Sequence, residues 1–205
     1  MEAYLGYDPG GRDANAVALL IVDGTVAEFS TALVNSVDAG VAWCSTQLNG
    51  REPIAIGVDA FLFWETGPGG WRACDKWLRE RYPRVRNSVL SSNSATGSMS
   101  IQGMAFAIAA RQIWPEAQLI EAHPKVLYFA RRGVKYSWEV GMTEWLKNVL
   151  NATGSVAITT DHEWDALFSA WAAYQGARGR WPMDLRQMSE SVIEPAGPVR
   201  YWWPD

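Results

Sequence analysis

The segment YLGYDPGGR (residues 4–12) carries the clearest fold signal in this 205-residue sequence. Apolar and aromatic residues lead to Asp8 and Pro-Gly-Gly follows at once, so a strand is expected to end at the aspartate, where the backbone turns sharply. Aspartate is a good turn former, which is one interpretation of this position. The alternative is that Asp8 binds a metal ion at the strand tip. Gly10 and Gly11 would then let a phosphate approach the backbone, because glycine has no Cβ atom.

The sequence on either side of this segment predicts an α/β fold. Residues 16–22 (AVALLIV) form an apolar strand, and Asp23-Gly24 predicts a hairpin into residues 25–30, which gives an antiparallel meander. Short strands at residues 53–59 and 118–121 alternate with helices and are expected to be parallel. The prediction is a mixed five-stranded sheet with helices on both faces. The helices are expected at residues 38–48, 72–82, 101–114, 125–132, 138–151 and 161–178.

Composition favours one globular domain, residues 1–205, with a core over about residues 3–178. The Pro- and Trp-rich tail, residues 179–205, is expected to fold back onto this core through Trp202 and Trp203. The longest apolar run, residues 16–22, is far shorter than the roughly 20 residues of a membrane span. The two cysteines lack metal-binding spacing, and no signal peptide is recognisable. We therefore expect a cytoplasmic protein with no membrane partner.

The charge distribution is uneven. The net charge of −4 argues against a general nucleic-acid coat protein. Residues 72–86, however, carry six cations and two acids, an excess of four positive charges. Such a segment is either a surface that meets phosphates or an ordinary solvated helix face.

Three predicted strands end in an acid: Asp8, Asp59 and Glu121. If the strand at residues 53–59 pairs beside the first strand, Asp8 and Asp59 face the same crevice, where ligands bind on open α/β sheets. Carboxylates gathered at one sheet edge repel each other unless a cation lies between them. Oxygen ligands of this kind suit Mg²⁺ or Mn²⁺, and a pair of such ions can promote phosphodiester cleavage.

The helix at residues 161–178 supplies a further acid. Thr160 and Glu163 form a plausible capping box, which places the helix start. His162 and Asp165 are neighbours on a side that otherwise carries small residues, so Asp165 would be buried against the sheet. An unpaired buried carboxylate is costly, which favours a functional role for Asp165. The helix dipole, by contrast, is enough to explain Asp161, and a role for Asp161 as a fourth ligand is the alternative.

Four segments together resemble a domain-of-unknown-function family of predicted nucleases in the ribonuclease-H-like superfamily. They are IGVDAFL (56–62), GGWRACDKWLR (69–79), LIEAHPKVL (119–127) and DHEWDALFSAW (161–171). The DPG tip and the H-x-x-D of the last helix are also similar to RuvC-type resolvases. The likeness covers roughly residues 3–175. One departure is Phe61, where the family usually has proline.

The resemblance implies metal-dependent phosphodiester hydrolysis. Asp8, Asp59 and Asp165 would bind the ions and act in catalysis, with Glu121 or His162 as a fourth group. Arg72 would either pair with Asp75 or direct its guanidinium at a phosphate near the site.

The resulting hypothesis is a nuclease that uses Mg²⁺ or Mn²⁺ on DNA or RNA. A symmetric dimer would suit branched DNA. Two alternatives remain: a non-catalytic module that binds nucleic acid or protein, and an actin-like nucleotide-binding protein. The actin-like class needs a second domain, for which 205 residues leave no room unless the chain dimerises.

Overall fold

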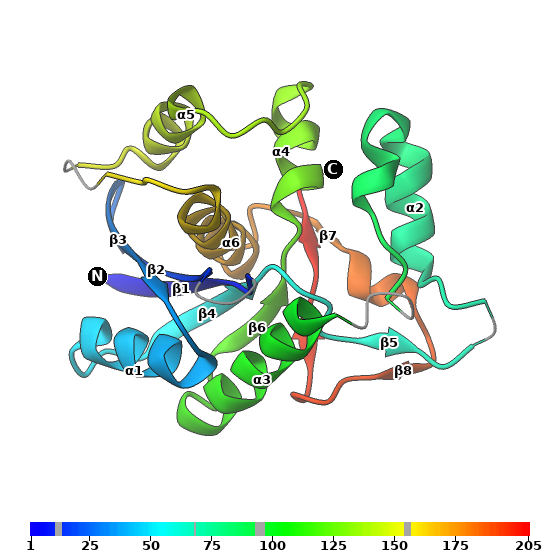
Figure 1. Ribbon diagram of the computed structural model, residues 1–205, viewed down its shortest axis with the longest axis horizontal. Helices are drawn as coiled ribbons and strands as arrows, with labels where there is room; N and C mark the ends of the chain where they lie inside the picture. The colour runs from blue at the N-terminus through cyan, green and yellow to red at the C-terminus, as the bar shows by residue number, and fades with distance from the viewer. Residues whose placement is uncertain (11–13, 68, 93–96, 154–156) are drawn as a thin grey trace.

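The computed structural model describes residues 1–10, 14–67, 69–92, 97–153 and 157–205. A mixed sheet runs through its centre (Figure 1). Its strands, in spatial order, are β3 (Val26–Val34), β2 (Asn15–Asp23), β1 (Glu2–Asp8), β4 (Pro53–Val58), β6 (Gln118–Glu121) and β9 (Val199–Arg200). The α/β class with a mixed sheet is therefore confirmed.

The strands pair as predicted from β3 to β6, and one further strand follows beyond β6. β1, β2 and β3 form the antiparallel meander, and β4 and β6 are parallel to β1. The expected number of five strands is wrong, because β9 adds a sixth, parallel to β6, among the described residues. Two residues are too few to show the alternating pattern by which a strand is recognised in sequence.

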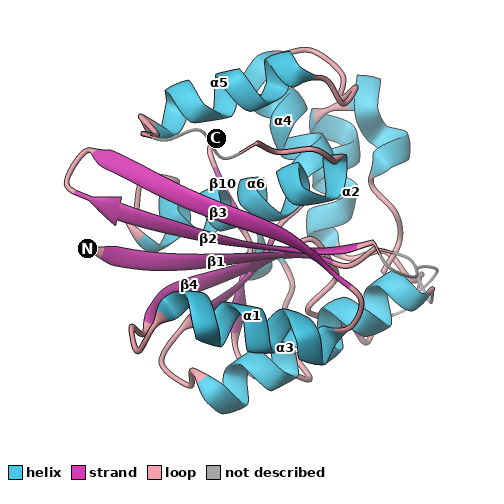
Figure 2. Ribbon diagram, turned by 60° about the vertical axis from the view of Figure 1, so that its left-hand side comes forward, coloured by secondary structure: helices cyan, strands magenta, loops and turns pink. Residues whose placement is uncertain are grey.

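Helices cover both faces of the sheet, as predicted (Figure 2). On one face lie α1 (Val37–Leu48) and α3 (Ser98–Ile113), and on the other lies α6 (Asp161–Ala177), with α4 (Pro124–Arg132) and α5 (Val140–Leu150) packed beyond it. The helix α2 (Ala73–Arg81) and the 3₁₀ helix η1 (Pro83–Ser88) flank the sheet. In the described chain, no helix combines the length and the apolar character that crossing a membrane requires.

Local capping explains where the two best-predicted helices begin. Ser36 accepts a hydrogen bond from the Ala39 amide and starts α1, which ends at Asn49 with φ of 49°. Thr160 and Glu163 form the full capping box at the start of α6. The Glu163 carboxylate also accepts a hydrogen bond from Thr31 on β3, which fixes this end of the helix on the sheet.

The C-terminal tail folds back onto the body, as predicted. Trp203 is fully buried and donates from Nε1 to the Tyr82 hydroxyl, while Trp202 lies directly over Gly176 of α6. The tail also forms β7 (Met183–Asp184), β8 (Val192–Ile193) and β10 (Trp202–Trp203). β8 pairs with β5 (Trp64–Glu65) and β10 with β7, and the η2 turn (Leu185–Met188) joins β7 to β8.

Candidate metal centre

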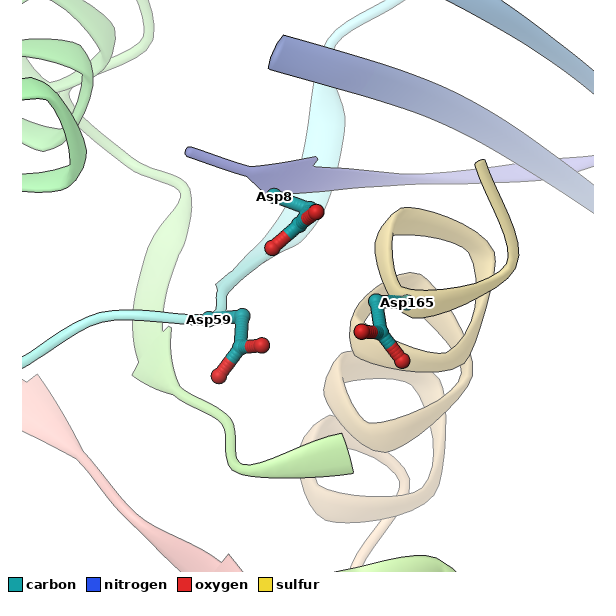
Figure 3. Close-up of side chains that lie close together, drawn as sticks. All are labelled: Asp8, Asp59 and Asp165. Carbon is teal, nitrogen blue, oxygen red and sulfur yellow. The ribbon is translucent and has the colours of Figure 1, made fainter. Parts of the chain in front are cut away.

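Three aspartates from distant parts of the chain converge at one end of the sheet. Asp8 is the last residue of β1, Asp59 follows β4, and Asp165 lies in the second turn of α6 (Figure 3). One carboxylate oxygen from each lies within 4.8 Å of the others. Asp8 and Asp165 are buried and Asp59 is partly exposed, so the group is open to solvent on the Asp59 side.

Two glycines allow α6 to reach these positions. A Cβ atom on Gly6 would lie 1.9 Å from the Ala166 carbonyl oxygen, and one on Gly57 would lie 2.0 Å from the Ser169 carbonyl oxygen. Gly6 and Gly57 face each other in the parallel β1–β4 register. Each comes two residues before its aspartate, and residues two apart in a strand point to the same face. The helix backbone therefore rests on bare strand backbone beside the two acids.

A repeated sequence motif, which the sequence analysis missed, indicates this geometry. The motif Gly-x-Asp occurs in both strands, as Gly6-Tyr7-Asp8 and Gly57-Val58-Asp59. Glycine weakens a strand interior and often marks the close approach of another backbone. Two copies at strand ends therefore indicate both where the helix packs and where the acids meet.

Burial and mutual repulsion make the three carboxylates difficult to ionise. Burial raises the pKa of all three, and that of Asp59 and Asp165 lies well above the usual range. The Asp8 carboxylate further raises the pKa of both Asp59 and Asp165. A cation placed among them would remove this repulsion.

One oxygen of the cluster has no partner. Asp165 Oδ1 is buried and accepts no hydrogen bond from the described residues. The Tyr136 hydroxyl lies near enough to lower the pKa of Asp165, but it also lacks a well-formed hydrogen bond within the described chain. A buried carboxylate oxygen left unpaired is costly, and a metal ion would satisfy it.

His162 contacts the cluster through Asp8. Its Nδ1 lies 2.6 Å from Asp8 Oδ2, and this hydrogen bond raises the pKa of the imidazole. An ionised carboxylate has two oxygens, so the second oxygen of Asp8 can still bind a metal ion. Asp161 is not one of the three converging carboxylates, although its charge raises the pKa of Asp8. It accepts a hydrogen bond from the His162 amide, as an acid in a first helical turn does.

Glu121 does not join the three aspartates. Its carboxylate receives a two-pronged ion pair from Arg72, at 2.8 Å from Nη1 and 2.5 Å from Nη2, and also accepts the Leu62 amide. The structure thus places this predicted ligand in a neighbouring buried cluster, where a guanidinium already neutralises it.

Arg72 pairs with Asp75, which is one of the two roles that the sequence predicted for it. Its guanidinium is 1% exposed and makes two hydrogen bonds to Asp75, at 2.9 and 2.8 Å. The Phe63 carbonyl oxygen accepts a further bond. All five N–H groups of the guanidinium are thereby used within the protein, which leaves none for a bound phosphate.

The glycine loop after β1 is only partly described. The Gly10 amide donates to Asn15 Oδ1, and a Cβ atom there would lie 2.4 Å from the Ala14 carbonyl oxygen. This glycine is therefore required by the turn itself. Gly11, the second glycine expected to admit a phosphate, lies outside the described residues.

Lys125 is a site residue that the sequence analysis missed. It lies in the first turn of α4, is exposed, and lowers the pKa of all three aspartates. A cation in a first helical turn opposes the helix dipole, so its position is unfavourable for the helix alone. This unfavourable position could have identified Lys125 from the sequence, because residues that oppose local stability concentrate at functional sites.

Comparison of the chain with protein-family models, with curated proteins and with solved structures gives no match. The function is therefore inferred from the geometry of the site.

Proposed function

We propose that the chain has a ribonuclease-H-like fold and hydrolyses phosphodiester bonds of nucleic acid with Mg²⁺ or Mn²⁺. Asp8, Asp59 and Asp165 would hold the metal. The observation that carries this proposal is the convergence of three carboxylates around Asp165 Oδ1, a buried oxygen without a partner among the described residues.

The sheet supports the fold part of the proposal. An antiparallel meander precedes two parallel strands, with the order β3-β2-β1-β4-β6. The acids lie at the ends of the two adjacent strands β1 and β4 and on a helix across them. This agrees with the resemblance of the sequence to the ribonuclease-H-like superfamily.

The donor set fits a hard divalent cation. All three groups offer carboxylate oxygens, and the group contains neither thiol nor imidazole, which softer metals prefer. When bound, the metal would supply an activated water and stabilise the leaving oxygen. The chain itself would orient Asp8 through His162 and attract the phosphate through Lys125.

Exposed cations support nucleic acid as the substrate. Arg72 is buried, but four other cations of residues 72–86 are exposed on α2 and η1 (Lys76, Arg81, Arg84 and Arg86). One of them, Arg81, pairs with Asp205 at the C-terminus. The others are available to phosphates, and binding through them would weaken with salt.

A metal-dependent cleavage assay tests the proposal. The wild type is expected to cut at least one of single-stranded, duplex or branched DNA or RNA in Mn²⁺ or Mg²⁺, and to be inactive in EDTA. Asp59→Asn is expected to reduce cleavage to background, because it removes a ligand with little change in shape. Asp161→Asn is the matched control: it makes the same change on α6 outside the cluster and is expected to remain active.

Failure to cut any of these substrates, with salt-sensitive binding retained, would instead indicate a non-catalytic nucleic-acid module.

A further inference from the structure

A cavity of about 380 Å³ opens beside Asp59. It lies between the end of β4, the start of α3 and the start of α4, and its wall includes Phe61, Leu90, Met99, His123 and Lys125. Its volume falls within the roughly 300–1,000 Å³ that small-molecule sites occupy. The cavity shares Asp59 with the metal centre, so a ligand in it would lie next to the proposed reaction.

Part of the cavity wall is apolar and partly exposed. Leu90 and Met99 line it and are 55% and 49% exposed. Phe61 also lines the cavity. These three side chains offer a flat aromatic surface and a flexible apolar edge to a ligand.

The Phe61 ring is held in place by the buried ion cluster. The Arg72 guanidinium carbon lies over one face of the ring, 4.7 Å from its centre. Arg72 is itself fixed by Glu121 and Asp75. A ring held in this way can stack on a base at little entropic cost.

The wall of the same cavity also offers groups that suit an anion. Lys125 lines it and lies near enough to the aspartates to lower their pKa. The first turn of α3 also faces the cavity, and Gly97 at its start has no side chain with which to cap the helix. The backbone N–H groups of a first helical turn and a lysine together favour a phosphate.

We propose that the cavity binds the base and sugar of one unpaired nucleotide, with its phosphate between Lys125 and the aspartates. This inference rests on the proposed nuclease function and names its substrate class: a single-stranded segment or end. A paired base would first have to leave its stack to enter the cavity, which costs energy that an unpaired base does not lose.

The first test measures binding separately from cleavage. Thymidine 5′-monophosphate contains no phosphodiester bond, so its binding can be followed by calorimetry in EDTA and in Mg²⁺. We expect the wild type to bind it, and Phe61→Leu and Met99→Glu to weaken binding about tenfold or more, as loss of a base contact does. Ile101→Glu is the matched control on α3, because Ile101 is 66% exposed and does not line the cavity.

The second test compares cleavage of a single strand with cleavage of the same sequence as a duplex. Preference for the single strand, lost in Phe61→Leu and Met99→Glu but kept in Ile101→Glu, would support the inference. Equal cleavage of both substrates, unaffected by the variants, would overturn it while the nuclease function stands. Absent cleavage with cavity-dependent nucleotide binding would overturn the function and leave the nucleotide site. Binding that is absent, or unchanged in both cavity variants, would overturn the inference.

Discussion

Replacing Asp165 by asparagine should stabilise the metal-free protein and abolish its response to metal. One oxygen of Asp165 lies within 4.8 Å of an oxygen from each of Asp8 and Asp59. At this distance two unit charges repel by about 1 kcal/mol in water and about 3.5 kcal/mol at an effective dielectric constant near 20. Lys125 and proton uptake reduce this repulsion, so we expect a net gain of about 2 kcal/mol at alkaline pH.

That gain corresponds to a melting temperature about 4–8 °C higher for Asp165→Asn in EDTA, by the usual scaling for a chain of this size. The sign of the pH dependence follows from the raised pKa of Asp165. A carboxyl with a raised folded-state pKa contributes stability at low pH, and that stability is lost as pH rises through this pKa. The advantage of Asp165→Asn should therefore shrink as the pH falls.

Metal reverses the order of the two proteins. At a free-ion concentration about 100 times Kd, linkage stabilises the wild type by about 2.7 kcal/mol. Asp165→Asn should lose most of this response, whereas Asp161→Asn should keep it and change the metal-free stability by about 0.5 kcal/mol or less. Thermal denaturation with and without Mn²⁺ measures both effects. A lower melting temperature of Asp165→Asn in EDTA, or an equal metal response in both proteins, would refute the reasoning.

Two further changes test the construction of the site. Gly57→Ala places a Cβ atom against the Ser169 carbonyl oxygen, so it should lower the free energy of unfolding by about 1–3 kcal/mol and weaken the metal response. Gly67→Ala is the control, because Gly67 has open space around it, and it should have neither effect. Chemical denaturation measures the difference. His123 is held neutral because burial lowers its pKa to about 4, so the wild type should lose up to about 3 kcal/mol as the pH falls from about 6.5 to 4. His123→Gln should lack this component; an unchanged pH profile would show that the imidazole does not titrate between these limits.

Much of the fold could be predicted because its signals are local. The strand at residues 118–121 and the start of α6 were predicted correctly, since apolar runs, turn residues and a capping box specify them within a few neighbours. β9 could not be predicted in the same way. It becomes a strand only because the tail passes beside β6, and the tail is held there by long-range contacts such as the hydrogen bond of the buried Trp203 to Tyr82.

The candidate site could be predicted only in part. Asp59 and Glu121 looked equivalent in the sequence, since each ends a short buried strand. Their environments differ because Arg72, 49 residues before Glu121, places its guanidinium against that carboxylate and not against Asp59. Nothing in the local sequence determines which of two acids receives a distant cation.

This difference between the acids bears on what neutralises the three aspartates. Glu121 is neutralised by Arg72, so its burial is compensated within the chain. Among the described residues, His162 pairs with Asp8, the exposed Lys125 lowers the pKa of all three aspartates, and neither residue hydrogen-bonds to Asp165 Oδ1. A fold that can compensate one acid with a buried arginine could compensate the others, or replace them with apolar residues at lower cost. Three clustered acids that lack such an arginine among the described residues support the proposed binding of a cation from solution.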